Sequence, residues 1–215
     1  AESAAEPAEA ATELEPWIEH LKKFMDQGAR AFKLDGWRQV LEHPDRDWGN
    51  GMCDEQMHNL YPLIYDKQMA LGVEAHTGRR PMVYSASGFA GVQQFVASWA
   101  GDTGGGPKPL LSMLNLGFSG HSNHSCDMDV FTRDGIHFGF LQTWAQLNNW
   151  AYWRQPWYLT SADKAMFKDY ACLRYALLPY LYSSAYQAAL TGWPVMRAMP
   201  LVYPDEPAMD EARTQ

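Results

Sequence analysis

The chain has 215 residues, of which 47% are hydrophobic and 13% aromatic; this is enough apolar material for one sizeable core or two small ones and excludes a disordered chain. Its formal net charge is −8 and no cluster of Lys or Arg interrupts the acidic balance, so nucleic acid is not an expected partner. No apolar run reaches the ~18 residues of a membrane-spanning helix, and the three cysteines share no metal-binding spacing.

The expected elements alternate between helices and strands. Apolar residues at a spacing of three and four predict helices, while short apolar runs bounded by Gly, Pro or polar residues predict strands. In chain order these are a frayed or disordered Ala- and Glu-rich tract (1–14), a helix (16–28), a buried strand (29–34), a polar loop (36–53), a helix capped by Asp54, a strand (82–84), a helix (91–96), a strand ending at Trp99, a helix (110–116), a polar segment (118–127), two helices (136–150 and 163–190) and a strand (195–202).

This alternation, with polar residues after the strands, is typical of a parallel α/β architecture whose site lies at the carboxyl ends of the strands. A complete (β/α)8 TIM barrel needs ~250 residues. The chain is therefore expected to hold a partial barrel, the C-terminal half or somewhat more, and to belong to a larger enzyme. The expected division is a disordered tract (1–14), the partial catalytic barrel (15–199) and the entry to a C-terminal β-domain (200–215).

Two aspartates each end a strand-like run. Asp35 follows Ala31-Phe32-Lys33-Leu34, and Asp102 follows Trp99-Ala100-Gly101. A retaining glycosidase places two carboxylates around one sugar carbon, one as nucleophile and one as proton donor, and the strand ends of a barrel can bring them together. Most of the 25 acidic residues are expected to be solvated, so the assignment depends on the surroundings of these two.

Those surroundings resemble the catalytic barrel of glycoside hydrolase family 31, which contains α-glucosidases and α-xylosidases. The resemblance covers about residues 16–207, nearly the whole chain. Its motifs, in the family's order, are Gly28-Ala29-Arg30-Ala31-Phe32-Lys33-Leu34-Asp35, Met57-His58-Asn59-Leu60-Tyr61, Phe89-Ala90-Gly91 with Trp99-Ala100-Gly101-Asp102, Leu178-Pro179-Tyr180-Leu181-Tyr182, Gly192-Trp193-Pro194-Val195-Met196-Arg197 and Tyr203-Pro204-Asp205-Glu206-Pro207.

The resemblance implies a retaining, exo-acting α-glycoside hydrolase without a metal or other cofactor, acting on a carbohydrate substrate. Asp35 would be the nucleophile and Asp102 the acid/base. Lys33 lies on the same side of the strand as Asp35 and could keep its carboxylate ionised, although a surface lysine at a strand end explains it equally well. The expected sugar-binding residues are Lys33, Trp37, Trp99, His121, Asn123, Asp127 and Phe131.

Some positions depart from the family pattern. Family glucosidases usually carry an Arg sixteen residues before the acid/base, where this chain has Ala86, and the usual Arg-x-His before the last barrel helix is absent. Ala86 removes a bidentate donor and leaves room, which would admit a 2-acetamido group, and His121 or Asn123 could bond an axial hydroxyl. We therefore expect a terminal α-N-acetylgalactosaminide or α-galactoside as substrate, with an α-glucoside or α-xyloside as the alternative.

Other readings compete with hydrolysis. His121, His124, Cys126 and Asp127 could ligate zinc, but His residues three apart on a strand point to opposite faces. The glycine-rich run 104–108 lacks the ending of a phosphate-binding loop. An inactive carbohydrate-binding remnant and transglycosylase or lyase chemistry on the same covalent intermediate also remain as alternatives.

Overall fold

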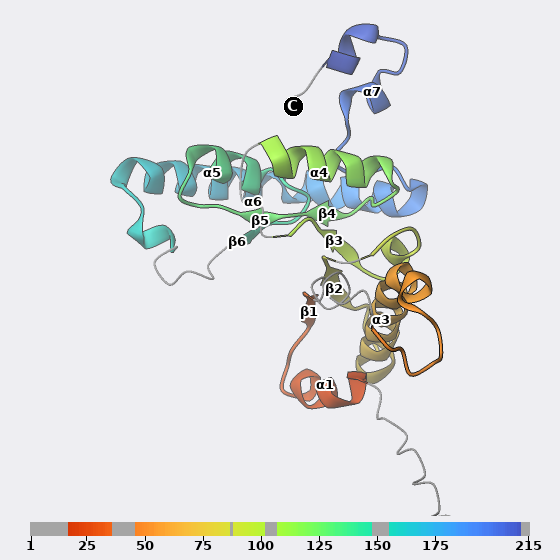
Figure 1. Cartoon of the computed structure of the whole chain (residues 1–215). Helices are drawn as coiled ribbons and strands as arrows, with labels where there is room; N and C mark the ends of the chain where they lie inside the picture. The colour runs from red at the N-terminus through yellow and green to blue at the C-terminus, as the bar shows by residue number, and fades with distance from the viewer. Residues whose placement is uncertain (1–16, 36–45, 87, 102–106, 148–154, 212–215) are drawn as a thin grey trace, which may run out of the picture.

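The computed structural model describes residues 17–35, 46–86, 88–101, 107–147 and 155–211. Helices and strands alternate along most of the chain (Figure 1). The elements are α1 (Trp17–Asp26), β1 (Ala31–Leu34), α3 (Asp54–Thr77), β2 (Met82–Ser85), η1 (Val92–Gln94), β3 (Ala97–Trp99), α4 (Pro107–Phe118), β4 (His124–Ser125), β5 (Asp127–Met128), α5 (Arg133–Phe140), β6 (Gln146–Leu147), η2 (Pro156–Tyr158), α6 (Ser161–Thr191), α7 (Met199–Val202) and η3 (Pro207–Glu211).

The strands form two parallel sheets. The larger has the order β1-β2-β3-β4, and the smaller pairs β5 with β6. Only Cys126 separates β4 from β5. The Asp127 N–H, at the start of β5, donates to the carbonyl of Gly101, which follows β3 (3.4 Å). All carboxyl ends of a parallel sheet lie at one edge, so the residues that follow β1, β2 and β3 are brought together there. This is part of the strand ring of a TIM barrel.

The first apolar core lies between α3 and the β1–β2 face that meets it. Leu34 and Val83 from the strands pack with Met69 and Val73 of α3. Because strand side chains alternate between faces, Lys33 and Tyr84 project from the opposite face of the sheet. The sheet therefore has an apolar face toward α3 and a polar and aromatic face away from it.

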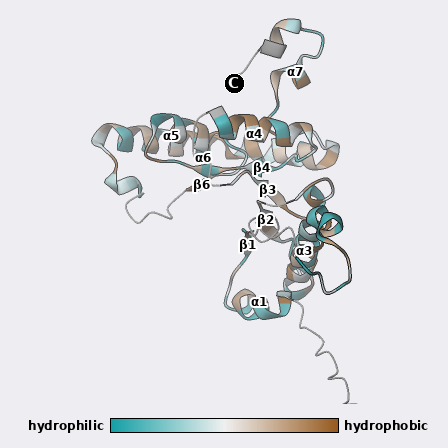
Figure 2. Cartoon of the chain, in the orientation of Figure 1, coloured by the Kyte–Doolittle hydropathy of each residue, from teal (hydrophilic) through white to brown (hydrophobic). Residues whose placement is uncertain are grey.

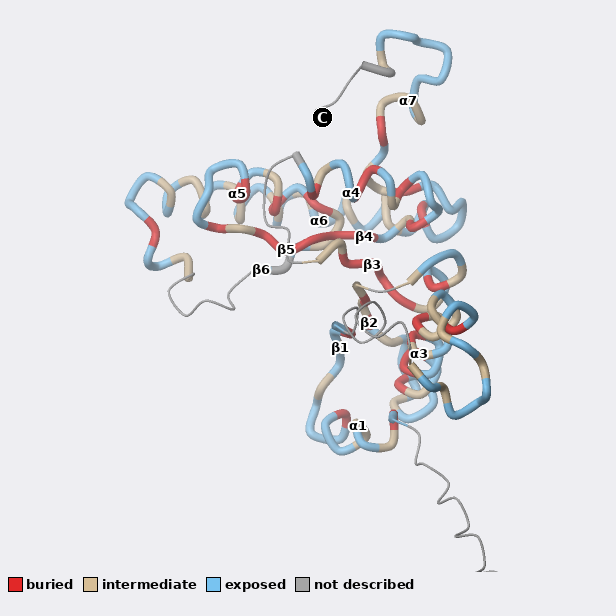
Figure 3. Tube along the Cα trace, in the orientation of Figure 1, coloured by how far each residue is buried: buried red, intermediate tan, exposed pale blue. Residues whose placement is uncertain are grey.

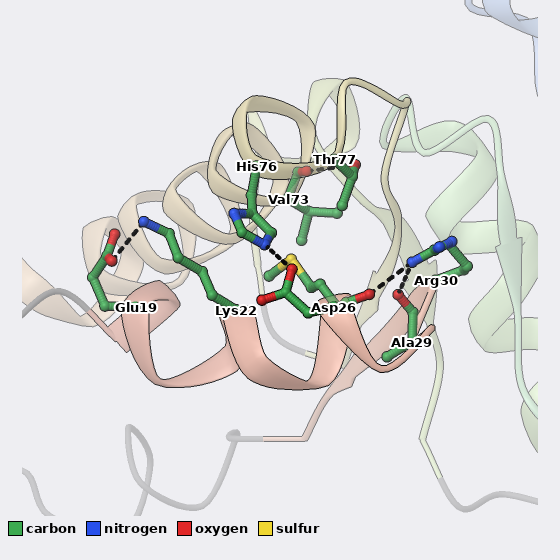
Figure 4. A network of polar contacts seen from close by, with 9 residues as sticks. Glu19, Lys22, Asp26, Ala29, Arg30, Val73, His76 and Thr77 are labelled. Atoms are coloured by element: carbon green, nitrogen blue, oxygen red, sulfur yellow. Dashed lines mark hydrogen bonds and ion pairs between the residues drawn. The ribbon is translucent and has the colours of Figure 1, made fainter.

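Helix α1 is fastened to the end of α3 by polar contacts (Figure 4). His76 Nε2 lies 2.7 Å from Asp26 Oδ1, and Arg30 Nη1 donates to the Met25 and Ala29 carbonyls at 2.9 and 3.1 Å. The Arg30 contacts close the turn between α1 and β1. They fix the entry to the strand that ends at Asp35.

A second core lies between β5, α5 and α6. It contains Met128, Val130, Ile136, Phe140 and Leu159. In Figure 1, α4, α5 and α6 lie together on one side of β4–β6; Figure 2 shows that α4 is largely hydrophobic, and Figure 3 that β3, β4 and β5 are buried. These strands therefore give the site a rigid base.

Most of the expected elements are confirmed, and the expected disordered tract 1–14 lies outside the described residues. Four expectations are wrong. The helix expected over 91–96 is only the single 3-10 turn η1. Cys53, not Asp54, is the N-cap of α3, and its N–H bonds Gln56 Oε1. The helix expected over 136–150 is α5, which ends at Phe140 and is followed by strand β6. The strand expected over 195–202 is absent, because Pro200 lacks the N–H that a ladder needs and instead suits the first turn of α7.

Candidate active site

Asp35 directly follows β1 at the carboxyl edge of the sheet. Its Oδ2 atom lies 3.8 Å from Lys33 Nζ, and the side chains of Lys33 and Asp35 are 30% and 47% exposed. The pair therefore combines an accessible carboxylate with a cation that attracts it. A surface ion pair of this kind contributes little to stability, so its value lies in orienting the carboxylate.

Trp99 joins three segments of the site. Its side chain is 3% exposed, its ring centroid lies 3.6 Å from Lys33 Nζ, and its Nε1 donates to Asp127 Oδ1 at 2.8 Å. A cation this close to an aromatic face is attracted by the ring quadrupole. The ends of β1 and β3 and the start of β5 thus converge through Lys33, Trp99 and Asp127.

Two aromatic residues at this site were missed by the sequence analysis. Tyr84 pairs in register with Lys33, and its ring centroid lies 4.8 Å from that of Trp144. Burial, together with the negative charge of Asp127, raises the pKa of the Tyr84 hydroxyl. Strand alternation could have found Tyr84, because it shares the face of Lys33. Trp144 has no such signal, since its segment was predicted to be helical.

The β4–β5 junction behind the site is held by Gln142. Its Oε1 accepts from the Ser125 hydroxyl and from the Cys126 N–H (3.0 Å). Arg174 of α6 donates from Nη1 to the Phe140 and Gln142 carbonyls at 2.8 and 2.7 Å. These contacts fix the loop that carries Trp144, so α6 supports the aromatic wall.

Of the other predicted site residues, Phe131 lies near the carboxyl ends of the strands, and two lie outside the described part of the chain. Phe131 lies beyond the carboxyl end of β5 with its ring 40% exposed, and its N–H bonds Asp129 Oδ1 at 2.9 Å. Asp102 and Trp37 lie outside the described residues. Gly101, directly before Asp102, adopts φ +87°, which favours glycine.

His121 and Asn123 are not brought to Asp35. Both precede β4 and therefore lie at the amino edge of the sheet, opposite the edge that carries Asp35. His121 is buried, and its Nδ1 lies 2.6 Å from the Ser98 hydroxyl. Asn123 is exposed. The expectation that these two contact a sugar at Asp35 has no support in this placement, because the short strand β4 separates them from the carboxyl edge.

His124 is also buried, and neither of its ring nitrogens has a hydrogen-bond partner among the described residues. Within the same part of the chain, no group of three His, Cys, Asp or Glu side chains could hold a metal ion. None of the helices in the described segments is both long and apolar enough to span a membrane.

The model of the glycosyl hydrolases family 31 TIM-barrel domain matches residues 8–184. The chain belongs to this family. It is 33% identical over 186 residues to neutral α-glucosidase AB of Sus scrofa, covering 78% of this chain and 20% of that protein. It is 25% identical over 200 residues to an α-xylosidase of Emericella nidulans, covering 87% of this chain and 26% of that protein.

Solved structures give the same fold for this family 31 barrel. A Flavobacterium johnsoniae dextranase complexed with glucose superposes with a TM-score of 0.78 and 23% identity, covering 92% of this chain and 28% of that chain. An α-xylosidase from a soil metagenome, complexed with xylose, superposes with a TM-score of 0.76 and 21% identity, covering 89% of this chain and 34% of that chain. The chain thus spans about a quarter of the length of the relatives that it matches.

Proposed function

We propose that this barrel is the catalytic part of a retaining α-glycoside hydrolase in which Asp35 is the nucleophile and Asp102 the acid/base. One observation carries the proposal: the Lys33 amino group lies between the Asp35 carboxylate and the face of Trp99, three residues before Asp102. An accessible carboxylate beside a cation and an aromatic wall suits attack on a sugar ring.

The reaction would proceed in two displacements. A carboxylate oxygen of Asp35 attacks the anomeric carbon while the bond to the leaving oxygen breaks, and Asp102 protonates that oxygen. Asp102 then takes a proton from water, which attacks the same carbon and releases Asp35 from the ester. The mechanism needs the two carboxyl groups ~5–6 Å apart, with some slack in an unliganded site.

The substrate we propose is a terminal α-glucoside or α-xyloside. The relatives reported above are named α-glucosidase and α-xylosidase, which favours sugars with equatorial hydroxyls. The expected α-galactoside or α-N-acetylgalactosaminide loses part of its basis, because His121 and Asn123 lie at the other edge of the sheet. One observation still favours this galacto-configured substrate: Ala86, which follows β2, is small and half-buried.

A panel of p-nitrophenyl α-glycosides tests this function in the full-length gene product. We expect the α-glucoside or α-xyloside to be cleaved with a kcat/KM at least tenfold above the α-galactoside and α-N-acetylgalactosaminide. Asp35→Asn should abolish the activity, while the exposed Asp205→Asn serves as the matched control. A preference for the galacto-configured sugars would favour the reading based on Ala86. The ratio of free sugar to oligosaccharide transfer products, measured without an added alcohol, separates hydrolysis from transglycosylation.

A further inference from the structure

Five residues on the polar and aromatic face of the sheet are linked in a closed circuit beside the proposed nucleophile. Lys33 Nζ lies 3.6 Å from the Trp99 ring centroid, and Trp99 pairs in register with Ser125 of β4. The Ser125 hydroxyl lies 2.6 Å from the carbonyl oxygen of Trp144. The circuit closes because the Trp144 ring centroid lies 4.8 Å from that of Tyr84, which pairs in register with Lys33. Partners in register on parallel strands share a face, so the circuit crosses one face of the sheet from β1 to β4.

Trp144 is the one residue of this circuit that does not lie on the larger sheet. It belongs to the segment between α5 and β6. Arg174 of α6 fixes this segment, because its guanidinium donates to the Gln142 and Thr143 carbonyls at 2.7 and 3.2 Å. The backbone is thus held directly before Trp144 by Arg174 and at Trp144 by Ser125. A side chain on a backbone held in this way is oriented before a ligand arrives, which lowers the cost of binding.

The aromatic pair of Tyr84 and Trp144 is partly open. Both residues are half-buried, so a portion of each side chain is accessible to a ligand. The Trp144 Nε1 atom is buried and has no hydrogen-bond partner in the part of the chain that the structure describes. An unpaired N–H costs stability, which a phenylalanine or leucine at the same place would avoid. The indole is therefore better explained by contact between its face and a ligand than by packing alone.

The circuit has a charged side and an aromatic side. The charges gather at Trp99, whose ring lies next to the Lys33 amino group and whose Nε1 donates to Asp127 Oδ1 at 2.8 Å. Tyr84 and Trp144 form the other side. A sugar with its anomeric carbon at the nucleophile turns its hydroxyls toward polar groups and its carbon-bound hydrogens toward aromatic faces. The edge of the sugar at C5 has the fewest hydroxyls, so it suits the aromatic side.

We propose that Trp144 is a specificity-determining residue, whose ring, backed by Tyr84, packs against the C5 edge of the terminal sugar. This role rests on the function proposed above. An α-glucoside carries a hydroxymethyl group at C5, and an α-xyloside carries only hydrogen there. The large indole restricts the space for that group, so Trp144 favours the α-xyloside more than a smaller residue would. One carbon group more or less in an apolar contact changes selectivity by about 10- to 200-fold.

The test measures the selectivity ratio of the full-length gene product, which is kcat/KM for p-nitrophenyl α-glucoside divided by kcat/KM for the α-xyloside. We expect Trp144→Ala to raise this ratio about tenfold or more, because it frees space for the hydroxymethyl group. The competitive inhibition constants of glucose and xylose give the same ratio when only one glycoside is cleaved, and they should shift in the same direction. A ratio that stays within about twofold of native overturns the proposal.

Trp144→Phe guards against an alanine variant that fails to fold, because it keeps an aromatic ring against Tyr84. We expect it to raise the ratio about threefold, since the smaller ring frees less space. Trp157→Phe is the matched control, because Trp157 is 63% exposed, and it should leave the ratio at the native value. Ile136→Ala, in the core of β5, α5 and α6, is the control for destabilisation. If Ile136→Ala shifts the ratio as much as Trp144→Ala at an equal loss of Tm, the effect is structural and the proposal is wrong.

The two proposals fail in distinguishable ways. If the native protein cleaves none of the glycosides, or if Asp35→Asn remains active, the proposed function fails and the specificity role fails with it. If the native protein is active, Asp35→Asn is inactive and both Trp144 variants keep the native selectivity ratio, only the specificity role is overturned.

Discussion

The Lys33 amino group lies 3.6 Å from the centroid of the Trp99 ring and 3.8 Å from Asp35 Oδ2, so one cation joins the ends of β1 and β3. These strands are not neighbours, because β2 lies between them. The long lysine side chain therefore crosses the face of β2 on the side of Tyr84. This places a positive charge next to the proposed nucleophile.

We predict that Lys33→Met lowers kcat about 10- to 100-fold, because the Asp35 carboxylate loses the charge that orients it. Lys33→Arg should recover part of the loss, since it keeps the charge but not the compact amino group. Steady-state kinetics of the full-length gene product measures both. The exposed Lys168→Met, on α6, is the matched control. A Lys33→Met variant with native kcat would make Lys33 a surface lysine, as the sequence alone also allowed.

Asp35 and Asp102 should respond differently to substitution. Asp35→Asn should abolish turnover, because an amide does not form the covalent glycosyl ester. Asp102→Ala should slow substrates with poor leaving groups most, and added azide should partly restore the rate by attacking the glycosyl-enzyme without a general base. Proton NMR of the first sugar product reports the stereochemistry. An inverted product would contradict the assignment of Asp35 as nucleophile.

His124 should make stability depend on pH. Burial, with a smaller contribution from His121, lowers the pKa of His124 from 6.5 to about 4 in the folded state. Between these values the unfolded chain binds more protons, so His124 makes the protein less stable as the pH falls from about 6.5 to about 4. We predict that His124→Gln flattens this loss of stability. The measurement is Tm against pH for the native protein and the variant, with their Tm difference at pH 8 taken as the baseline.

Asp66 opposes this trend. Burial raises its folded-state pKa from the ordinary value of 3.8 to about 7, so the folded state binds more protons between them and stability falls as the pH rises through that window. The two slopes partly cancel in the native protein. The net fall of stability with falling pH should therefore be steeper in an Asp66→Asn background. If His124→Gln leaves that slope unchanged in both backgrounds, His124 is excluded as its source.

The sequence predicted the parts of this fold that depend on local pattern. Short apolar runs ending at Leu34 and Trp99 predicted strands β1 and β3, and apolar residues at helical spacing predicted α1, α3 and α6. It failed where a tertiary contact decides. Gln142 ends the expected helix after Phe140 because its side chain serves the β4–β5 junction, and no local signal contains that contact.

The site was predicted in the same way. Lys33 and Asp35 lie at the end of β1, Trp99 ends β3, and Asp127 lies two residues after β4, so the rule that parallel strands end at one edge brings them together. His121 and Asn123 were selected for their chemistry alone, and their position before β4 separates them from the others. Asp66 lies on helix α3 and is buried. From sequence alone, an acidic residue on a helix is expected to be exposed to solvent.

The last prediction concerns the 215-residue chain expressed by itself. Helix α6 presents large side chains to solvent, with Tyr175 76% and Leu190 64% exposed, and β1 has a paired strand on one side only among the described residues. Exposed apolar surface and an open strand edge both favour association with other chains. We therefore expect residues 1–215 to aggregate or to form a partly ordered monomer without detectable hydrolysis, as judged by size exclusion and thermal melting. A monodisperse, active chain of 215 residues would show that these exposed surfaces need no partner.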